Sequence, residues 1–206
     1  MSGAYAPPAV NPTLPVSEKI HLIERHFREI MLALGLDIMD DSLKNTPLRV
    51  ARMYVNEIFS GLDPLNEPSV TLFENKYRYE EIILEKDIPL YSYCEHHFVP
   101  IIGKAHVAYI AGAKIAGLSK LNRVVRYFSK RPQVQERLTL QIAGFLKEKL
   151  ETDDVAVIIE AEHLCVASRG VKDMGSTTLT ASYHGLFEEQ EKKNELLHMV
   201  HGSGIR

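Results

Sequence analysis

Two short clusters of cysteine and histidine contain the residue types of this chain that are best suited to chemistry. Residues 94–97 read Cys-Glu-His-His, and His163 precedes Cys165 by two positions. Zinc binds thiolate sulfur and imidazole nitrogen, and a catalytic zinc usually has three protein ligands and one open position. Cys94, one of the two histidines after it, and Cys165 would supply three ligands. Two buried, apolar thiols are the alternative, but both cysteines of the chain stand beside histidines, which favours a metal.

The choice between His96 and His97 depends on the local backbone. Successive side chains of a strand point to opposite faces, so Cys94 and His96 would share one face. His97 would need a bulge or a strand end to reach the same metal. A structural zinc with four ligands is the main alternative, and it would use two histidines and leave no position open. By the same alternation, one strand face would carry His163, Cys165 and Arg169.

A second candidate site lies at residues 117–123, which read Gly-Leu-Ser-Lys-Leu-Asn-Arg. Ser119 would cap a helix there, and the free N–H groups of a helix N-terminus favour an anion. Lys120 and Arg123 would be neighbours on the first turn, so the corner could bind phosphate. The pattern G-x-x-x-x-G-K-[ST] is absent, which excludes a P-loop. The alternative is a solvated basic helix face, because the charge continues at Arg126, Lys130 and Arg131.

The elements that must position these clusters follow from hydrophobic periodicity. Helical patterns occupy 17–35 and 46–61, two more helices begin at Ser119 and after Pro132, and a charged helix closes the chain at 188–200. Strand patterns occupy 70–73, 81–84, 90–99, 105–110, 155–166 and 177–183. Two strands, two helices and two strands after a helical segment predict an α+β domain. We expect a flexible N-terminal arm (1–16), a helical extension (17–65) and a catalytic domain (66–206).

Composition limits the classes of protein to consider. The chain has 206 residues, a formal net charge of −3 and 45% hydrophobic residues, which suits a globular protein with no overall affinity for nucleic acid. It holds no apolar run near the ~20 residues that cross a bilayer. Residues 1–15 are rich in Ala and Pro and lack the basic and apolar regions of a signal peptide. We therefore expect a cytoplasmic protein with no membrane partner and no disulfide.

Five longer motifs connect these clusters to a known family. The sequence resembles GTP cyclohydrolase I over residues 45–187, through TPLRVARMYVNEIFSGL, CEHHFVP, GLSKLNR, RPQVQERLT and EAEHLCVASRG. The resemblance implies the tunnelling fold, an antiparallel ββααββ domain that assembles into a homodecamer with active sites between subunits. It also implies zinc-dependent opening of the guanine imidazole ring of GTP, which releases formate and gives 7,8-dihydroneopterin triphosphate. That product leads to tetrahydrofolate or tetrahydrobiopterin.

The resemblance also implies a role for each site residue. Zinc would be held by Cys94, His97 and Cys165. Proton transfer would involve His96 and His163, with Gln135 in the catalytic group. Glu136 would read the guanine, because one carboxylate can accept hydrogen bonds from both N1–H and the 2-amino group. The triphosphate would be held by Ser119, Lys120, Arg123, Arg169 and Arg49.

Three other functions fit parts of the pattern. Another enzyme of the same fold, such as a pterin synthase or a queuosine-pathway enzyme, is the first, although pterin synthases bind zinc mainly through histidines. A zinc nucleoside deaminase is the second, but the P-C-x-x-C of that family is absent. A zinc-stapled oligomer that senses GTP without turning it over is the third. Two uncoordinated histidines beside the metal argue against a sensor, because binding alone does not need them.

Overall fold

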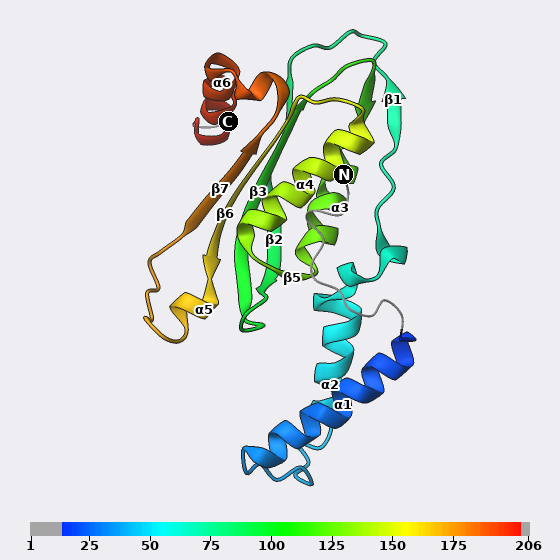
Figure 1. Cartoon of the computed structure of the whole chain (residues 1–206), viewed down its shortest axis with the longest axis vertical. Coiled ribbons are helices and arrows are strands. Elements are labelled where there is room, and N and C mark those ends of the chain that lie inside the picture. Colours follow the sequence, from blue (N-terminus) through cyan, green and yellow to red (C-terminus); the bar gives the residue numbers. More distant parts are fainter. Residues whose placement is uncertain (1–13, 203–206) are drawn as a thin grey trace.

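A five-stranded sheet forms the centre of the chain in a computed structural model that describes residues 14–202 (Figure 1). The strand order is β5-β2-β3-β6-β7. Its four longer strands are antiparallel to their neighbours: β2 (Ile82–Cys94), β3 (Pro100–Ile110), β6 (Val155–His163) and β7 (Thr178–Tyr183). The short β5 (Pro132–Gln133) runs parallel to β2 and pairs with its last residues, Tyr93 and Cys94. This pairing fixes the position of the end of β2.

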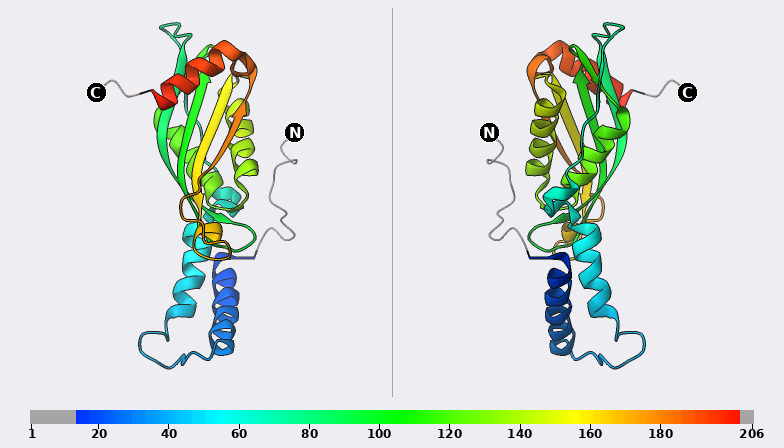
Figure 2. Two further views of the ribbon diagram at one scale, coloured as in Figure 1. Left: turned by 90° about the vertical axis from the view of Figure 1, so that its left-hand side faces the viewer. Right: turned by 90° about the vertical axis from the view of Figure 1, so that its right-hand side faces the viewer.

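Helices cover both faces of the sheet. Helices α3 (Leu118–Ser129) and α4 (Gln135–Leu150) pack on one face, and α6 (Gln190–His201) lies across the other, after the short turn η4 (Gly185–Glu188) (Figure 2). Strand β6 is buried on both sides because its residues alternate between the two cores. Val157 and Ile159 belong to the core under α3 and α4, whereas Ala156 and Ile158 belong to the core under α6. This explains why the strand is a continuous apolar run.

A helical hairpin projects from the end of the sheet where β2 ends (Figure 1). It consists of α1 (Val16–Ala33) and α2 (Thr46–Met53), and α2 continues into the π-helical turn η1 (Tyr54–Ile58). The 3-10 turns η2 (Ser60–Leu62) and η3 (Pro64–Asn66) then join it to the domain. Gly61 donates its amide to the Lys130 carbonyl (2.8 Å). An added Cβ at Gly61 would lie 2.1 Å from the Tyr127 carbonyl oxygen, so only glycine fits this junction.

The remaining elements are short. Strands β1 (Leu72–Glu74) and β4 (Lys114–Ala116) form a separate antiparallel pair, and α5 (Leu164–Ala167) is a single helical turn after β6. None of the helices within residues 14–202 is long and apolar enough to cross a membrane.

The structure confirms the predicted α+β class and corrects several boundaries. The predicted strand 90–99 ends at Cys94, and the predicted strand 155–166 ends at His163. The cap expected at Ser119 is wrong, because Gly117 is the N-cap of α3 and Ser119 is its second helical residue. Of the expected N-terminal arm, residues 1–13 lie outside the part that the structure describes.

Candidate active site

A tight turn follows β2 and carries both histidines of the first cluster. The Cys94 amide donates to the Val99 carbonyl (2.9 Å), and the Cys94 carbonyl accepts from the Phe98 amide (2.8 Å). Phe98 has a φ of 52°, in the left-handed region that non-glycine residues seldom adopt, and the chain reverses there. Because strand alternation stops at Cys94, His97 turns back and places Nδ1 3.8 Å from Cys94 Sγ. This is the strand end that a Cys-x-x-His pair requires.

Cys94, His97 and Cys165 form a group that could hold a metal ion. One ligand atom from each residue lies within 4.8 Å of the other two, and no other such group of three occurs within residues 14–202. Tetrahedral zinc, with ligands at about 2.0–2.3 Å, holds its ligand atoms roughly 3.5 Å apart, so a small inward movement would suffice. Two thiols and one imidazole are a donor set that zinc accepts, and three ligands leave a fourth position open.

The two thiols interact with each other. Burial raises the pKa of the Cys165 thiol, the adjacent Cys94 thiol raises it further, and the positive charge of Arg169 lowers it. A pair of thiols at this separation resists losing both protons, because two thiolates would repel each other. A bound cation removes that repulsion, so the donor set is suited to a positively charged occupant.

Cys165 reaches the site from a helical turn and not from a strand. The expectation that one strand face carries His163, Cys165 and Arg169 is therefore wrong, because the chain enters α5 directly after His163. Arg169 nevertheless returns to the site, and its Nη1 lies 2.7 Å from Nε2 of His97. A guanidinium group can only donate, so Nε2 of His97 accepts this bond. The other ring nitrogen, Nδ1, then faces the thiols.

His163 has a fixed orientation because of Gln135, the first residue of α4. The Gln135 side-chain amide nitrogen donates to the carbonyls of Ile159 (3.0 Å) and Thr178 (2.9 Å). Since carbonyls only accept, Oε1 of Gln135 must face Nε2 of His163, which lies 2.8 Å away. Nε2 of His163 therefore carries a hydrogen, and Nδ1 keeps its lone pair. Burial lowers the pKa of His163, although the Glu136 carboxylate acts in the opposite direction.

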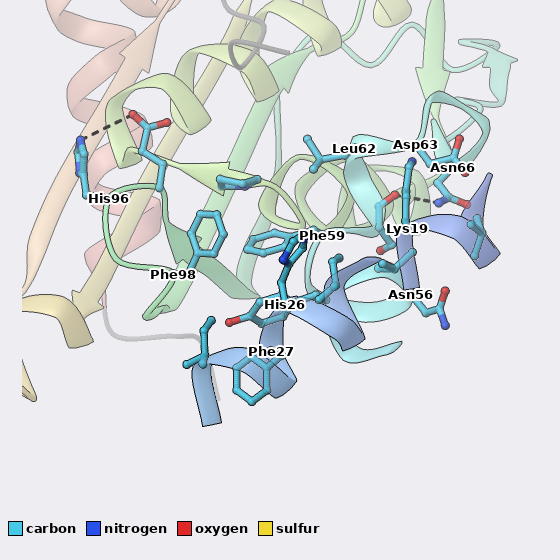
Figure 3. A pocket seen from close by; sticks show the side chains of 18 residues that line it. Lys19, His26, Phe27, Asn56, Phe59, Leu62, Asp63, Asn66, His96 and Phe98 are labelled. Carbon is cyan, nitrogen blue, oxygen red and sulfur yellow. Dashed lines mark hydrogen bonds and ion pairs between the residues drawn. The ribbon is translucent and has the colours of Figure 1, made fainter. Parts of the chain in front are cut away.

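His96 lies on the outer side of the turn. It is exposed, with Nδ1 3.8 Å from Cys94 Sγ and Nε2 3.8 Å from a carboxylate oxygen of Glu95. Figure 3 shows it at one end of a pocket of about 1160 Å³, with Phe98 and Phe59 further in. The ring centroids of those two residues are 4.9 Å apart. This aromatic contact packs the turn after β2 against the segment that follows α2.

Glu136 lies exposed at the second position of α4, between two residues that are held in place. On one side, Gln135 is buried against β6 and β7. On the other side, Arg137 donates to the Gln133 side chain (3.0 Å) and forms an ion pair with Glu95. The Glu136 carboxylate is close enough to His163 to influence its pKa. The Glu136 carboxylate is thus presented near His163 on the first turn of α4.

The expected triphosphate ligands do not come together in one chain. Ser119 and Lys120 lie at the beginning of α3, where Asn122 donates to the Glu85 side chain (2.9 Å) near the beginning of β2. Cys94 is nine residues further along β2, which corresponds to about 30 Å at ~3.3 Å per residue. Arg123 is exposed on the same part of α3, and Arg49 is exposed on α2. Arg169 is the expected triphosphate ligand that contacts His97, a member of the possible metal group.

Comparison with known proteins identifies the family. The model of GTP cyclohydrolase I matches residues 23–201. The chain belongs to the GTP cyclohydrolase I family. The GTP cyclohydrolase 1 of Vibrio cholerae is 55% identical over 183 residues, which cover 88% of this chain and 84% of the relative. The enzyme of the same name from Flavobacterium johnsoniae is 52% identical over 183 residues, which cover 89% of this chain and 82% of the relative.

This member of the GTP cyclohydrolase I family contains site residues that the sequence reasoning missed. Two of them are Glu95 and Arg137, which form an ion pair between the turn after β2 and helix α4. The third is Thr180, whose hydroxyl lies 3.1 Å from the Gln135 amide nitrogen. Glu95 stands inside the Cys94–His97 motif, so its position in the sequence could have indicated that it belongs to the site. Arg137 follows Glu136 directly, but nothing in the sequence indicated that a partner 42 residues away would bind it.

Proposed function

We propose that the chain is a zinc-dependent GTP cyclohydrolase that opens the guanine imidazole ring of GTP, releases formate and forms 7,8-dihydroneopterin triphosphate. The observation that carries this proposal is the possible metal group of Cys94, His97 and Cys165, with Nδ1 of His96 3.8 Å from Cys94 Sγ and His163 two residues before Cys165. Family membership supplies the reaction. The product would serve tetrahydrofolate or tetrahydrobiopterin biosynthesis in the cytoplasm.

Zinc is the proposed cofactor, with Cys94, His97 and Cys165 as its ligands. When bound, it lowers the pKa of a coordinated water toward ~7 and supplies a nucleophile near neutral pH. Coordination through Nδ1 of His97 would place the ring hydrogen on Nε2, so the contact of Nε2 with the Arg169 guanidinium would have to open when the metal binds.

His96 and His163 are the proposed proton-transfer residues. C8 of guanine becomes electrophilic when N7 is protonated, and the exposed His96 is the proposed donor of that proton. His163 holds a hydrogen on Nε2 toward Gln135, so its Nδ1 is available to accept a proton in the later ring-opening and rearrangement steps. The depressed pKa of His163 keeps the ring neutral and able to accept near neutral pH.

Glu136 is the proposed guanine-reading residue. Its carboxylate is exposed beside the metal site and can accept hydrogen bonds from both N1–H and the 2-amino group. Adenine lacks the 2-amino group and has no hydrogen on N1, so it would leave the carboxylate unpaired. Sites built on such pairing reject the wrong ligand by up to ~10⁴-fold.

The triphosphate site is proposed to form between subunits. Arg169 contacts His97 just after the end of β2, whereas Ser119 and Lys120 lie near the beginning of β2, about 30 Å away by strand length, and Arg123 follows one turn later on α3. One chain therefore cannot place all of them on one triphosphate, but a neighbouring copy can bring its α3 to the metal end. Strand β7 is the last strand of the sheet and has an unpaired edge for such a neighbour. We propose the tunnelling fold and a homodecamer on this basis, with Arg49 as an additional phosphate ligand.

The test is incubation of purified, zinc-loaded protein with GTP, with ATP as the control nucleotide. We expect formate and 7,8-dihydroneopterin triphosphate from GTP, neither product from ATP, and loss of both products after chelation of the metal. Well-folded, zinc-loaded oligomer that releases no formate from GTP would contradict the proposal.

A further inference from the structure

A long-range ion pair joins the turn between β2 and β3 to α4. Glu95, the residue after the first cysteine, places its carboxylate against the guanidinium of Arg137 from α4. Both side chains are largely buried, with 27% of Glu95 and 17% of Arg137 exposed. Removing one partner of an ion pair that is shielded in this way is costly, because the other charge is left without compensation away from water. Glu95 joins this turn to α4, and His97 joins it to Arg169 from the segment after α5.

Arg137 is itself held by three separate groups. Its Nε donates to the Gln133 side-chain oxygen (3.0 Å), and its Nη2 donates to the Pro132 carbonyl (2.9 Å) as well as to Glu95. Gln133 is fully buried and donates in turn to the Phe128 carbonyl (2.9 Å). These contacts fix the position of the guanidinium. Through it, the carboxylate of Glu95 in the turn is held against α4 and β5.

The backbone of the turn is joined to the same segment. The Glu95 amide donates to the Gln133 carbonyl (3.0 Å), next to the place where β5 pairs with the end of β2. Glu95 is therefore bound at its backbone by β5 and at its side chain by α4. His96 and His97, which follow it directly, are exposed, and His97 is also contacted by Arg169 (2.7 Å). The geometry of the possible metal group then depends on how firmly Glu95 is held.

We propose that Arg137 is a positioning residue of the metal centre: acting through Glu95, it holds the turn in the conformation that brings His97 to Cys94 and Cys165. This inference rests on the metal centre of the proposed function and assigns a role to a residue outside the ligand group. Groups that orient metal ligands from behind typically change metal affinity by 10–100-fold. Arg137 also joins the turn to the helix that carries Glu136, so the same contact would set the distance between metal and guanine.

The test is zinc affinity of the full-length chain, measured by competition with a chromogenic chelator. We expect Arg137→Ala and Glu95→Ala each to weaken zinc binding by about 10–100-fold. Because the two residues would act as one unit, the double variant should bind zinc no more weakly than the worse single variant. Lys147→Ala removes an ion pair with Asp153 at the other end of α4 and should bind zinc like the wild type.

Two conservative variants keep the test decisive if an alanine variant does not fold. Glu95→Gln keeps an oxygen that accepts from Arg137 and should remain within about threefold of wild-type affinity. Arg137→Lys keeps the charge but cannot reach Glu95, Gln133 and Pro132 together, so its affinity should fall between wild type and Arg137→Ala. Wild-type affinity in every folded Arg137 variant, or losses that add in the double variant, would overturn the inference. A wild-type chain that binds no zinc would instead overturn the proposed metal centre itself.

Discussion

Oε1 of Gln135 lies 2.8 Å from Nε2 of His163, at the point where the first turn of α4 meets the end of β6. The amide nitrogen on the other side of Gln135 is held by the carbonyls of Ile159 and Thr178. The contact therefore fixes which ring nitrogen of His163 carries hydrogen.

Gln135→Leu removes the acceptor that fixes His163. We expect turnover of GTP to fall by about 10²-fold, because His163 would lose its tautomer and orientation. The free energy of unfolding should also fall by about 1–3 kcal/mol, because two buried carbonyls lose their donor. Formate release and thermal unfolding would measure the two effects. Thr139→Val is the matched control, since Thr139 donates to the Gln135 carbonyl but does not contact His163 in this structure, and it should leave turnover close to wild type.

Alanine variants of the three histidines of the site should differ in how much zinc they bind. His97→Ala should lose zinc and activity together, because it removes a proposed ligand. His96→Ala and His163→Ala should keep zinc and lose about 10²–10⁴-fold in turnover, as expected for proton-transfer residues. Mass spectrometry of the bound metal and an assay for formate would check this. Zinc loss in His96→Ala but not in His97→Ala would show that the ligand assignment is reversed.

Glu136→Gln should weaken recognition of guanine. The amide can accept one hydrogen bond but adds a donor that faces donors on the base. Loss of a charge-assisted pair costs about 1.5–3 kcal/mol, which corresponds to roughly a 10–100-fold lower kcat/KM for GTP. Glu148→Gln on the same helix, where the carboxylate is mostly exposed, is the control. Equal kcat/KM for both variants would exclude Glu136 as the guanine reader.

Shared active sites predict complementation between inactive variants. His163→Ala removes a residue at the metal end of the sheet, and Arg123→Ala removes one at the other end. If each site combines these residues from two subunits, a mixed oligomer made from equal amounts should recover about a quarter of wild-type activity, because chance pairing leaves that share of sites intact. Activity that stays at the level of the separate variants after verified subunit mixing would contradict shared sites.

His106 should make stability depend on pH. It is buried in β3, and burial lowers its pKa below the usual 6.5 despite the nearby Asp87 carboxylate. The unfolded chain therefore binds a proton near pH 6.5 while the folded chain does not, so stability falls as the pH decreases below 6.5 toward the folded pKa. His106→Asn, which keeps an acceptor for the Asp87 amide, should reduce this fall. Denaturant unfolding at pH 7.5 and pH 5.5 would measure it, and an unchanged pH dependence would contradict the prediction.

Local sequence patterns predicted most of the helices and strands, because the residues that an element buries recur with its own period along the sequence. Leu121, Val124 and Val125 of α3 are fully buried as their spacing indicates. The predictions failed where backbone geometry changes within one or two residues. At Cys94 and at His163 the strands end earlier than the apolar pattern, and Gly117 replaces Ser119 as the N-cap. Such boundaries are set by tertiary hydrogen bonds, which leave little trace in the local sequence.

The group of Cys94, His97 and Cys165 that could hold a metal is the set that the family resemblance implied, but the residues that surround and support this group could not be predicted. Strand alternation alone favoured His96, and only the observed turn explains how His97 reaches Cys94. The ion pair of Glu95 with Arg137 joins residues 42 positions apart, and its pairing depends on how β5 meets β2. The separation of Ser119 from the metal end likewise depends on the direction of α3 along the sheet.

The proximity of Cys94 and Cys165 has a consequence for the redox sensitivity of the protein. Two thiols that interact directly are the reactants of a disulfide, and a two-electron oxidation would join β2 to α5 covalently. A cation that engages both sulfurs withholds them from that reaction. Metal loss and air oxidation would then act in sequence, the first exposing the thiols and the second preventing the metal from returning. Protein purified without metal should therefore stay reconstitutable only while a reductant keeps this pair reduced.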